Sequence, residues 1–182
     1  PGIAYDDYGT SELCLGKNAT LSMGDLDINR AGWTGTAEQH AYADPGVKIT
    51  ASDNSTLNLN SLTVSTKKYL AVGKETSVTT TGYGLFSLDK ATVNVAGNVK
   101  LSDSATRLDL TGAGNFNVKG TLTIKGQMTA IGTKLSTNAL SIADAGKLTI
   151  GDQATLIAPL ATVFTENPTF ESESLSLQRG LT

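Results

Sequence analysis

The chain has 182 residues, of which 39% are apolar, 17% are charged and 5% are aromatic. The apolar share is too large for a disordered segment, and a net charge of −3 offers no basic footprint for nucleic acid or for anionic lipid. Glycine is frequent, proline is scarce, and Thr, Ser, Asn, Leu and Val supply most of the rest. This composition favours strands and turns over helices, and no apolar run has the length of a membrane span.

The N-terminal residues 1–16 show no clear period, and we expect them to form an irregular segment or a cap. Cys14, the only cysteine, lies in this segment. It has no partner for an internal disulfide and no companions for a zinc site, and its place between Leu13 and Leu15 predicts an outward side chain without a role. No cofactor or metal site is expected. Because the chain opens on Pro1 without a methionine, we expect it to be part of a longer protein.

From Lys17 onward one short pattern recurs: a polar turn, a small residue, a Thr, and then alternating apolar positions. Its copies lie at residues 17–23, 53–59, 89–95, 103–108, 120–124 and 152–157. The first three copies are evenly spaced, because Thr20, Thr56 and Thr92 lie 36 residues apart. Self-similarity on this scale indicates a repeat architecture.

Further strand-like pieces lie between these copies, at residues 26–28, 47–49, 62–64, 85–88, 99–101, 140–142, 148–150 and 160–163. Apolar and polar residues alternate, so that Leu57 and Leu59 point to one side of a strand and Asn58 to the other. The window closest to helical spacing, residues 137–146, contains Gly146 and several Ser and Thr residues. We therefore expect an all-β chain without a substantial helix.

Strands this short cannot bury an apolar face alone, so each copy must stack on the next. The predicted fold is a parallel β-helix, or β-solenoid, of stacked short strands over residues 17–164, with a protruding loop. Tight or left-handed turns are expected at Asn18, Asn54, Gly97, Asn98, Gly120 and Gly126. Sharp corners are expected at the small residues Ala19, Ser55, Ala91 and Ala154. An antiparallel sandwich is the alternative, but the Asn-Gly and Asp-Gly turns that it would need are nearly missing.

The Thr-Leu-x-Leu strands that follow Asn/Asp-x-Ala turns, with Gly-Asn-Val at 97–99 and Gly-Thr-Leu-Thr-Ile at 120–124, resemble the passenger region of bacterial autotransporters. The resemblance extends over residues 17–163 and lies in the pattern, which filamentous haemagglutinin-like adhesins and phage tailspikes share. It implies a right-handed parallel β-helix in a secreted or surface-exposed bacterial protein of the outer membrane, with a part in cell adhesion and virulence. The Gly-Asp-Ser-Gly nucleophile motif of the serine-protease passengers is absent.

The longest break in the pattern, residues 29–46, holds the only tryptophan, Trp33, the only histidine, His40, and Tyr42. Insertions in a solenoid emerge from one face and often carry recognition, and Trp and Tyr suit stacking on sugar rings or anchoring a protein contact. The alternative is that Trp33 folds back as a cap over the open edge of the solenoid. His40 has no evident catalytic partner. These three residues form the candidate ligand-binding set.

An acidic pair, Asp25 and Asp27, flanks Leu26, so a strand would project both carboxylates outward on one face. Polysaccharide lyases and hydrolases built on β-helices place carboxylates in this way for calcium or for acid–base work. The alternative is that both are simple solvated residues. The basic run Lys-Lys-Tyr at residues 67–69 is interpreted as a solvated turn.

After Phe164 the pattern changes. Residues 165–182 are predicted to form a turn followed by a last strand at 175–177, or a cap. The end of a solenoid exposes unpaired backbone groups that must be covered or continued.

These features predict a non-catalytic adhesive or structural stalk that contacts a host surface protein, a glycan or another copy of itself. For self-association, we expect Asn58, Asn60, Thr63 and Asn94 to form polar ladders along an outward face. No nucleic-acid partner is expected, and the resemblance implies membrane contact only through a barrel outside this chain. The alternative is a polysaccharide-processing enzyme or a tailspike-like glycan binder, and an enzyme would require several acids and bases that converge on one face.

Overall fold

The computed structural model describes residues 9–34, 41–70, 77–164 and 169–172. In these residues every regular element is a β-strand. Most strands belong to two large sheets, within which each pairing is parallel. Antiparallel pairing occurs, in this part of the chain, only within two short hairpins. The expectation of an all-β chain is confirmed, and the direction of pairing excludes the antiparallel sandwich.

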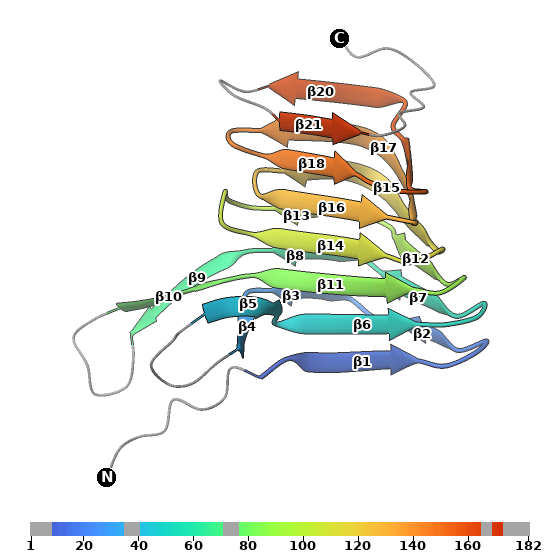
Figure 1. Ribbon diagram of the computed structural model, residues 1–182, viewed down its shortest axis with the longest axis horizontal. Helices are drawn as coiled ribbons and strands as arrows, with labels where there is room; N and C mark the ends of the chain where they lie inside the picture. Colours follow the sequence, from blue (N-terminus) through green and yellow to red (C-terminus); the bar gives the residue numbers. More distant parts are fainter. Residues whose placement is uncertain (1–8, 35–40, 71–76, 165–168, 173–182) are drawn as a thin grey trace.

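The first large sheet has seven strands, which follow one another in the sheet in the order of the sequence (Figure 1). They are β1 (Ser11–Leu15), β6 (Val47–Ala51), β11 (Tyr83–Leu88), β14 (Arg107–Thr111), β16 (Gln127–Ile131), β18 (Lys147–Ile150) and β21 (Thr169–Ser172). Their registers place like side chains in columns, for example Ile49 next to Phe86 and Phe86 next to Leu110.

The second large sheet has ten strands, arranged in two rows. The first row is formed by β2 (Thr20–Ser22), β7 (Thr56–Leu59), β12 (Thr92–Val95), the first parts of β15 (Asn115–Ile124) and β17 (Lys134–Ala143), and β19 (Thr155–Ile157). The second row is formed by β3 (Asp25–Ile28), β8 (Ser61–Val64), β13 (Val99–Leu101), the later parts of β15 and β17, and β20 (Leu160–Phe164). β15 and β17 therefore connect the two rows without a break.

The chain alternates between the two sheets. We call a strand of the seven-stranded sheet, together with the strands of the ten-stranded sheet that follow it, a layer. The described layers are β1–β3, β6–β8, β11–β13, β14–β15, β16–β17 and β18–β20. After each layer the chain returns to the seven-stranded sheet one strand further along (Figure 1).

The length of a layer explains the spacing seen in the sequence. Arg107 pairs with Gln127 and Gln127 with Lys147, so a layer in this region takes 20 residues. Ser11 pairs with Val47, a separation of 36 residues. The 36-residue period of the first copies is thus a layer plus an insertion.

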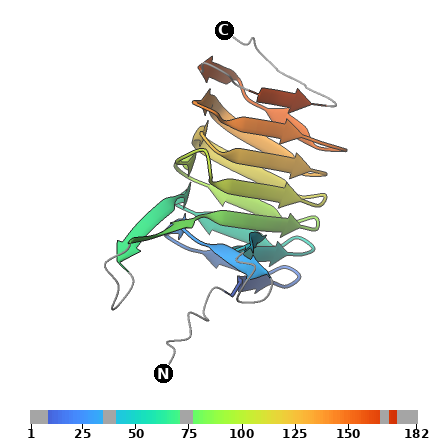
Figure 2. The same ribbon diagram turned by 60° about the vertical axis from the view of Figure 1, so that its left-hand side comes forward.

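Both insertions are antiparallel hairpins. β4 (Ala31–Thr34) and β5 (Ala41–Pro45) lie between β3 and β6, and β9 (Thr66–Leu70) and β10 (Ser77–Thr81) lie between β8 and β11. Both hairpins project from the same corner, where the chain runs from the ten-stranded sheet to the seven-stranded sheet. Figures 1 and 2 show the two hairpins on one side of the molecule near its N-terminal end. In later layers short turns at 102–106, 125–126 and 144–146 replace them.

The core fills the space between the two sheets. Inward residues alternate with outward ones, so that Leu57 and Leu59 are buried whereas Asn58 between them is partly exposed. The rings of Phe86 and Phe116, from opposite sheets, meet edge to face with their centroids 5.5 Å apart, an arrangement that favours aromatic pairs. Strands with one apolar face thus bury it only when the layers stack.

The turns that leave the seven-stranded sheet require left-handed backbone. Asn18 and Asn54 have φ values of 60° and 59°, as expected, and Lys90 and Gln153 occupy the same place in later layers with φ values of 52° and 57°. Most L-residues pay a steric cost there, and Asn pays less than most.

Of the remaining predicted turn residues, Gly97, Asn98, Gly120 and Gly126, none has a positive φ. Their conformation is tight without being left-handed. At Gly126, for example, an added Cβ would lie 2.2 Å from the carbonyl oxygen of Thr106, so close approach of the neighbouring layer accounts for the glycine.

The four small residues predicted at corners, Ala19, Ser55, Ala91 and Ala154, each follow a left-handed turn residue. Ser55, Ala91 and Ala154 are buried there, and Ala19 is partly buried. In the fourth layer the corner holds Gly114, where an added Cβ would lie 2.4 Å from the Cβ of Leu88. In the fifth layer Thr133 follows the left-handed Gly132 and is buried at the same corner.

One boundary differs from expectation. Residues 1–16 were expected to be irregular or a cap, yet β1 forms at residues 11–15, because Leu13 and Leu15 pair inward beside Ile49 and Ala51. The window 137–146 contains the end of β17 and a turn, and is not helical. The last strand predicted at 175–177 lies outside the described residues.

Candidate functional site

The predicted insertion at 29–46 is anchored to the layers at its base. The N–H of Gly46 donates to the carbonyl of Tyr83 (2.8 Å), and the N–H of Tyr83 donates to the carbonyl of Arg30 (3.2 Å). A Cβ on Gly46 would lie 1.8 Å from that Arg30 oxygen, which explains the glycine. The base of the β4–β5 hairpin is therefore held against the start of β11.

The candidate ligand-binding residues are only partly placed. Trp33 lies on β4 and Tyr42 on β5, so antiparallel pairing brings their backbones into one hairpin, with an irregular register between Gly32 and Thr34. The side chains of Trp33 and Tyr42, and all of His40, lie outside the described part. Their role, as ligand contact or as cap, stays a prediction.

The acidic pair Asp25 and Asp27 projects from one face of β3 into solvent, as the alternation predicted. The Ser61 hydroxyl donates to Asp25 (2.7 Å), and the Ser65 hydroxyl donates to Asp27 (2.8 Å). Asn29 also donates to Asp27 (3.3 Å). Each carboxylate thus accepts a hydrogen bond from the next layer. Among the described residues, no three or more His, Cys, Asp or Glu side chains form a cluster that could hold a metal ion.

The basic run at residues 67–69 is not a turn. Lys67 and Lys68 lie on β9, where both are exposed. The Lys67 ammonium is 4.0 Å from the Asp27 carboxylate, a distance and exposure at which an ion pair contributes little. The β9–β10 hairpin is a second protrusion, which the sequence interpretation missed although the β-branched run at 78–81 was a signal for a strand.

An amide ladder follows the outward face of the first row of the ten-stranded sheet. The Asn94 amide donates to the Asn58 side-chain oxygen (3.1 Å), and the Asn117 amide donates to the Asn94 side-chain oxygen (3.0 Å). At the lower end the Asn58 amide donates to the Ser22 hydroxyl (3.3 Å). The parallel register aligns these side chains, so the predicted ladder of Asn58 and Asn94 is confirmed and extends over four layers.

The other predicted ladder residues behave differently. Thr63 is in register with Asp27 on one side and Lys100 on the other, and Asn60 is an exposed corner residue. A second column, with Thr20, Thr56 and Thr92 in register, runs beside the amide ladder. This face therefore presents hydroxyl and amide groups in two parallel lines.

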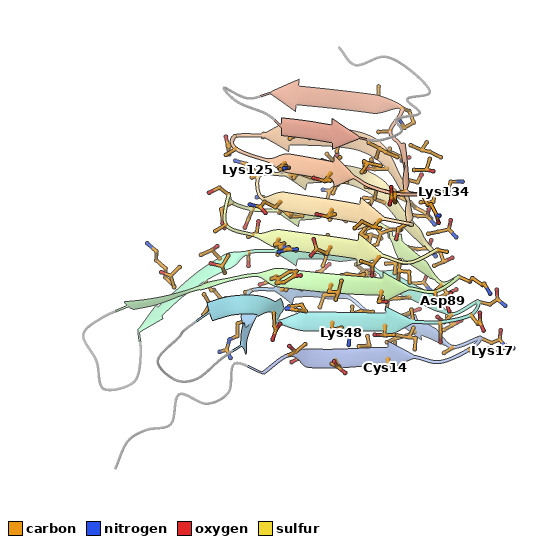
Figure 3. All side chains as sticks on the ribbon, viewed as in Figure 1. Cys14, Lys17, Lys48, Asp89, Lys125 and Lys134 are labelled. Carbon is orange, nitrogen blue, oxygen red and sulfur yellow. The ribbon has the colours of Figure 1, made fainter. Side chains whose placement is uncertain are left out.

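The outward face of the seven-stranded sheet carries mixed polar residues. In Figure 3, Cys14 and Lys48 project from this face on β1 and β6. The Lys48 ammonium lies 3.3 Å from the Glu12 carboxylate on the next strand. Cys14 is exposed, as expected.

A cluster of Tyr83, Arg107 and Asp109 joins β11 to β14 on this face. The Tyr83 hydroxyl donates to Asp109 Oδ2 (2.7 Å), and Arg107 Nε donates to the same oxygen (2.9 Å). Arg107 Nη2 lies 2.7 Å from this oxygen in an ion pair. The guanidinium carbon lies 4.7 Å from the centre of the Tyr83 ring. Asp109 is only 7% exposed although it points outward.

Burial and hydrogen bonding shift the protonation of this cluster. Desolvation, chiefly, together with the hydrogen bond to the Asp109 carboxylate raises the pKa of Tyr83 to about 12. The pKa of Arg107 is raised chiefly by its hydrogen bonds to Asp109. At neutral pH the cluster therefore combines a neutral phenol with a charged guanidinium.

Only part of this cluster can be predicted from the sequence. Alternation along Arg107-Leu108-Asp109 places Arg107 and Asp109 on the same outward face. Tyr83 joins them through the pairing of β11 with β14, at a separation of 24 residues that differs from both the 36-residue and the 20-residue spacing. That register could not be read from the repeat.

Comparisons of the chain with protein-family models, curated proteins and solved structures found no match. Among the described residues there is no helix long and apolar enough to span a membrane.

Proposed function

We propose that the chain is a parallel β-solenoid that acts as a rigid, non-catalytic adhesive or structural stalk of an exported bacterial surface protein. The solenoid assignment is supported by the return of the chain to the same sheet after each layer and by the in-register columns of buried Leu, Val, Ile and Phe residues. The cell-surface location and export follow from the resemblance in sequence pattern to autotransporter passengers.

The single observation that carries the adhesive role is the amide ladder. Asn58, Asn94 and Asn117 lie half-buried in one line, with Thr56 and Thr92 in the neighbouring line. A line of groups that both donate and accept can pair with a second polar surface along its whole length. Many weak contacts in register then add up to adhesion, either to another copy or to a regular polymer.

A glycan-binding role is the second candidate. Its support is the Tyr83, Arg107 and Asp109 cluster, in which a charged pair faces outward on a wall of stacked strands. The acidic pair Asp25 and Asp27 gives little support to an enzymatic function, because Ser61 and Ser65 already donate hydrogen bonds to it. A catalytic role is not part of the proposal.

The test is adhesion of beads that carry the purified chain. We expect the beads to clump without any coat, or to be retained on one glycan-coated or matrix-coated surface. Asn94→Leu, which interrupts the ladder, should abolish clumping, while Asn60→Leu at an exposed corner should not, because Asn60 lies outside the amide ladder and outside the neighbouring line of Thr56 and Thr92. Beads that neither clump nor adhere would contradict the adhesive role.

The hairpin is tested in the same assay. Retention on a coat that is lost in a Trp33→Ala, Tyr42→Ala variant, with clumping unchanged, would assign ligand contact to the β4–β5 hairpin. Retention unchanged in that variant would leave the hairpin with the role of a cap.

A further inference from the structure

Beyond its first layer, the ten-stranded sheet carries positive charge and no negative charge. Its later strands, β7, β8, β12, β13, β15, β17, β19 and β20, contain Lys100, Lys119 and Lys134 but no Asp or Glu. The residues that connect the two rows, at 60, 96–98 and 158–159, are uncharged. The described carboxylates lie in the first layer, the turns, the β4–β5 hairpin and the seven-stranded sheet. The net charge of −3 therefore conceals a basic face.

The three ammonium groups of this face are available to a ligand. Lys100, Lys119 and Lys134 are exposed, and none of their ammonium groups takes part in an ion pair or hydrogen bond with another described residue. In Figure 3, Lys134 lies at the right-hand edge of the stack, whereas Lys48 lies on the front face. Lysines outside this face differ, since four of them have a carboxylate within 4.0 Å: Lys48, Lys67, Lys90 and Lys125.

The three lysines lie on one diagonal of the face. Lys100 is in register with Thr123, four residues after Lys119 on β15, and Lys134 is in register with Asn115, four residues before Lys119. Each step of the diagonal is therefore one strand across and four residues along, or roughly 14 Å over the surface at the usual strand spacing and rise. The positive charges are thus evenly spaced and cross from one row to the other.

Uncharged hydrogen-bonding groups occupy the intervals between the lysines. Asn117 and Ser136 lie in the interval toward β17, and Asn98 and Thr121 lie in the interval toward β13. Asn117 donates one of its two amide N–H groups to Asn94 and keeps the other. Amide and hydroxyl groups of this kind pair with sugar hydroxyls, which both donate and accept hydrogen bonds.

We propose that a linear polysaccharide with carboxylate groups binds along this diagonal. Its carboxylates lie at Lys100, Lys119 and Lys134, and its hydroxyls pair with the amide and hydroxyl groups between them. The inference rests on the proposed adhesive role and names the polymer to which the sheet with the amide ladder adheres.

The spacing of the charges selects the class of polyanion. A nucleic acid strand carries one phosphate in about every 3.4 Å, and single strands bind proteins through stacking on aromatic side chains. Phe116, the only aromatic residue among the described side chains of these strands, is buried. Anionic lipid attracts clusters of four or more basic residues. A polysaccharide with one carboxylate in each disaccharide instead leaves neutral sugars between its charges, as the intervals of this face require.

The test is binding of the purified whole chain to fluorescent hyaluronan, which carries one carboxylate in each disaccharide, followed by fluorescence polarisation. Neutral dextran and oligothymidine are the comparison probes. We expect hyaluronan to bind at low salt and to be released as salt rises, because exposed charges are screened. Dextran and oligothymidine should bind at least roughly tenfold more weakly, since each lacks one of the two features that the face recognises.

Three variants locate the site. Combined Lys100→Gln, Lys119→Gln and Lys134→Gln should weaken hyaluronan roughly tenfold, as for the loss of three exposed ion pairs. Combined Lys17→Gln, Lys48→Gln and Lys68→Gln removes the same charge from other parts of the surface and should bind as the parent does. Exchange of the first three lysines for Arg keeps their charge and should also preserve binding. Circular dichroism confirms that each variant is folded.

Four outcomes would overturn the proposal: no binding of hyaluronan at low salt, equal binding of dextran, tighter binding of oligothymidine, or equal losses in the two glutamine variants. Clumping of uncoated beads needs no polysaccharide. Beads that clump while hyaluronan fails to bind would therefore remove this ligand and leave the adhesive stalk, whereas loss of both would remove the proposed function as well.

Discussion

Lys90 and Gln153 hold left-handed backbone at turns where the first two layers have Asn18 and Asn54. A left-handed conformation costs most residues roughly 1–2 kcal/mol, and Asn is among the residues that adopt it most readily. We expect Lys90→Asn and Gln153→Asn each to raise the free energy of unfolding by about 0.5–1 kcal/mol, since the turn is retained and its cost is reduced. Urea-induced unfolding followed by circular dichroism measures the change.

The matched control is Lys100→Asn. Lys100 is exposed on β13 and has no positive φ, so the same exchange should bring no gain there. The exposed ion pair of Lys90 with Asp53, at 3.9 Å, is too weak to mask the effect. Equal changes at Lys90 and Lys100 would show that backbone conformation is not the cause.

The pKa of Tyr83 links stability to alkaline pH. The folded protein holds the phenolic proton more tightly than the unfolded chain, because burial and the Asp109 carboxylate raise the pKa from 10.0 to about 12. This contribution is complete below the unfolded pKa and is lost as pH rises from about 10 through about 12. We expect the free energy of unfolding to fall more steeply over that range in the parent protein than in Tyr83→Phe. Parallel curves for the two proteins would contradict the assignment.

At the scale of the element, the amide ladder should contribute in proportion to the hydrogen bonds that each residue makes. Asn94 takes part in two amide-to-amide bonds and Asn117 in one. With a net value of about 1 kcal/mol for each bond, Asn94→Ala should lower the free energy of unfolding by about twice as much as Asn117→Ala. Denaturant titration of both variants tests the ratio.

Asn115→Ala is the control for this series, because Asn115 shares β15 with Asn117 and lies outside the ladder. Its cost should stay within about 0.5 kcal/mol, as for most surface exchanges. If Asn115 cost as much as Asn94, the loss would reflect strand propensity and not the ladder. A double-mutant cycle on Asn58 and Asn94 then isolates the bond between them.

Prediction from the sequence succeeded where the alternation of neighbouring residues determines the structure. It failed where the structure depends on pairing between segments that are distant in the sequence. The alternation around Leu57 and Asn58 was enough to assign the inner and outer faces of β7, and the small corner residues followed from it. The β9–β10 hairpin was missed because Lys67 and Lys68, both exposed, show no apolar alternation. The hydrogen bond from Tyr83 to Asp109 depends on the register between two layers. The alternation of neighbouring residues does not encode that register.

At the scale of the whole molecule, stability should rise toward the middle layers. β15 and β17 pair with strands on both sides along their length, whereas β1 has a partner on one side only among the described strands. Leu13, Leu21 and Leu26 of the first layer are also only partly buried. We expect amide hydrogen exchange to be slowest in β15 and β17 and markedly faster in β1 to β3. Uniform exchange across the layers would indicate a single cooperative unit instead.

The stacking of layers also determines how the molecule responds to a pulling force. A load applied at the two ends pulls neighbouring layers apart, so the bonds between them open one row after another instead of all at once. Each layer of 20 residues in the later part of the chain would then release about 70 Å of extended polypeptide. Under a steady load the stack would therefore lengthen in steps, one layer at a time.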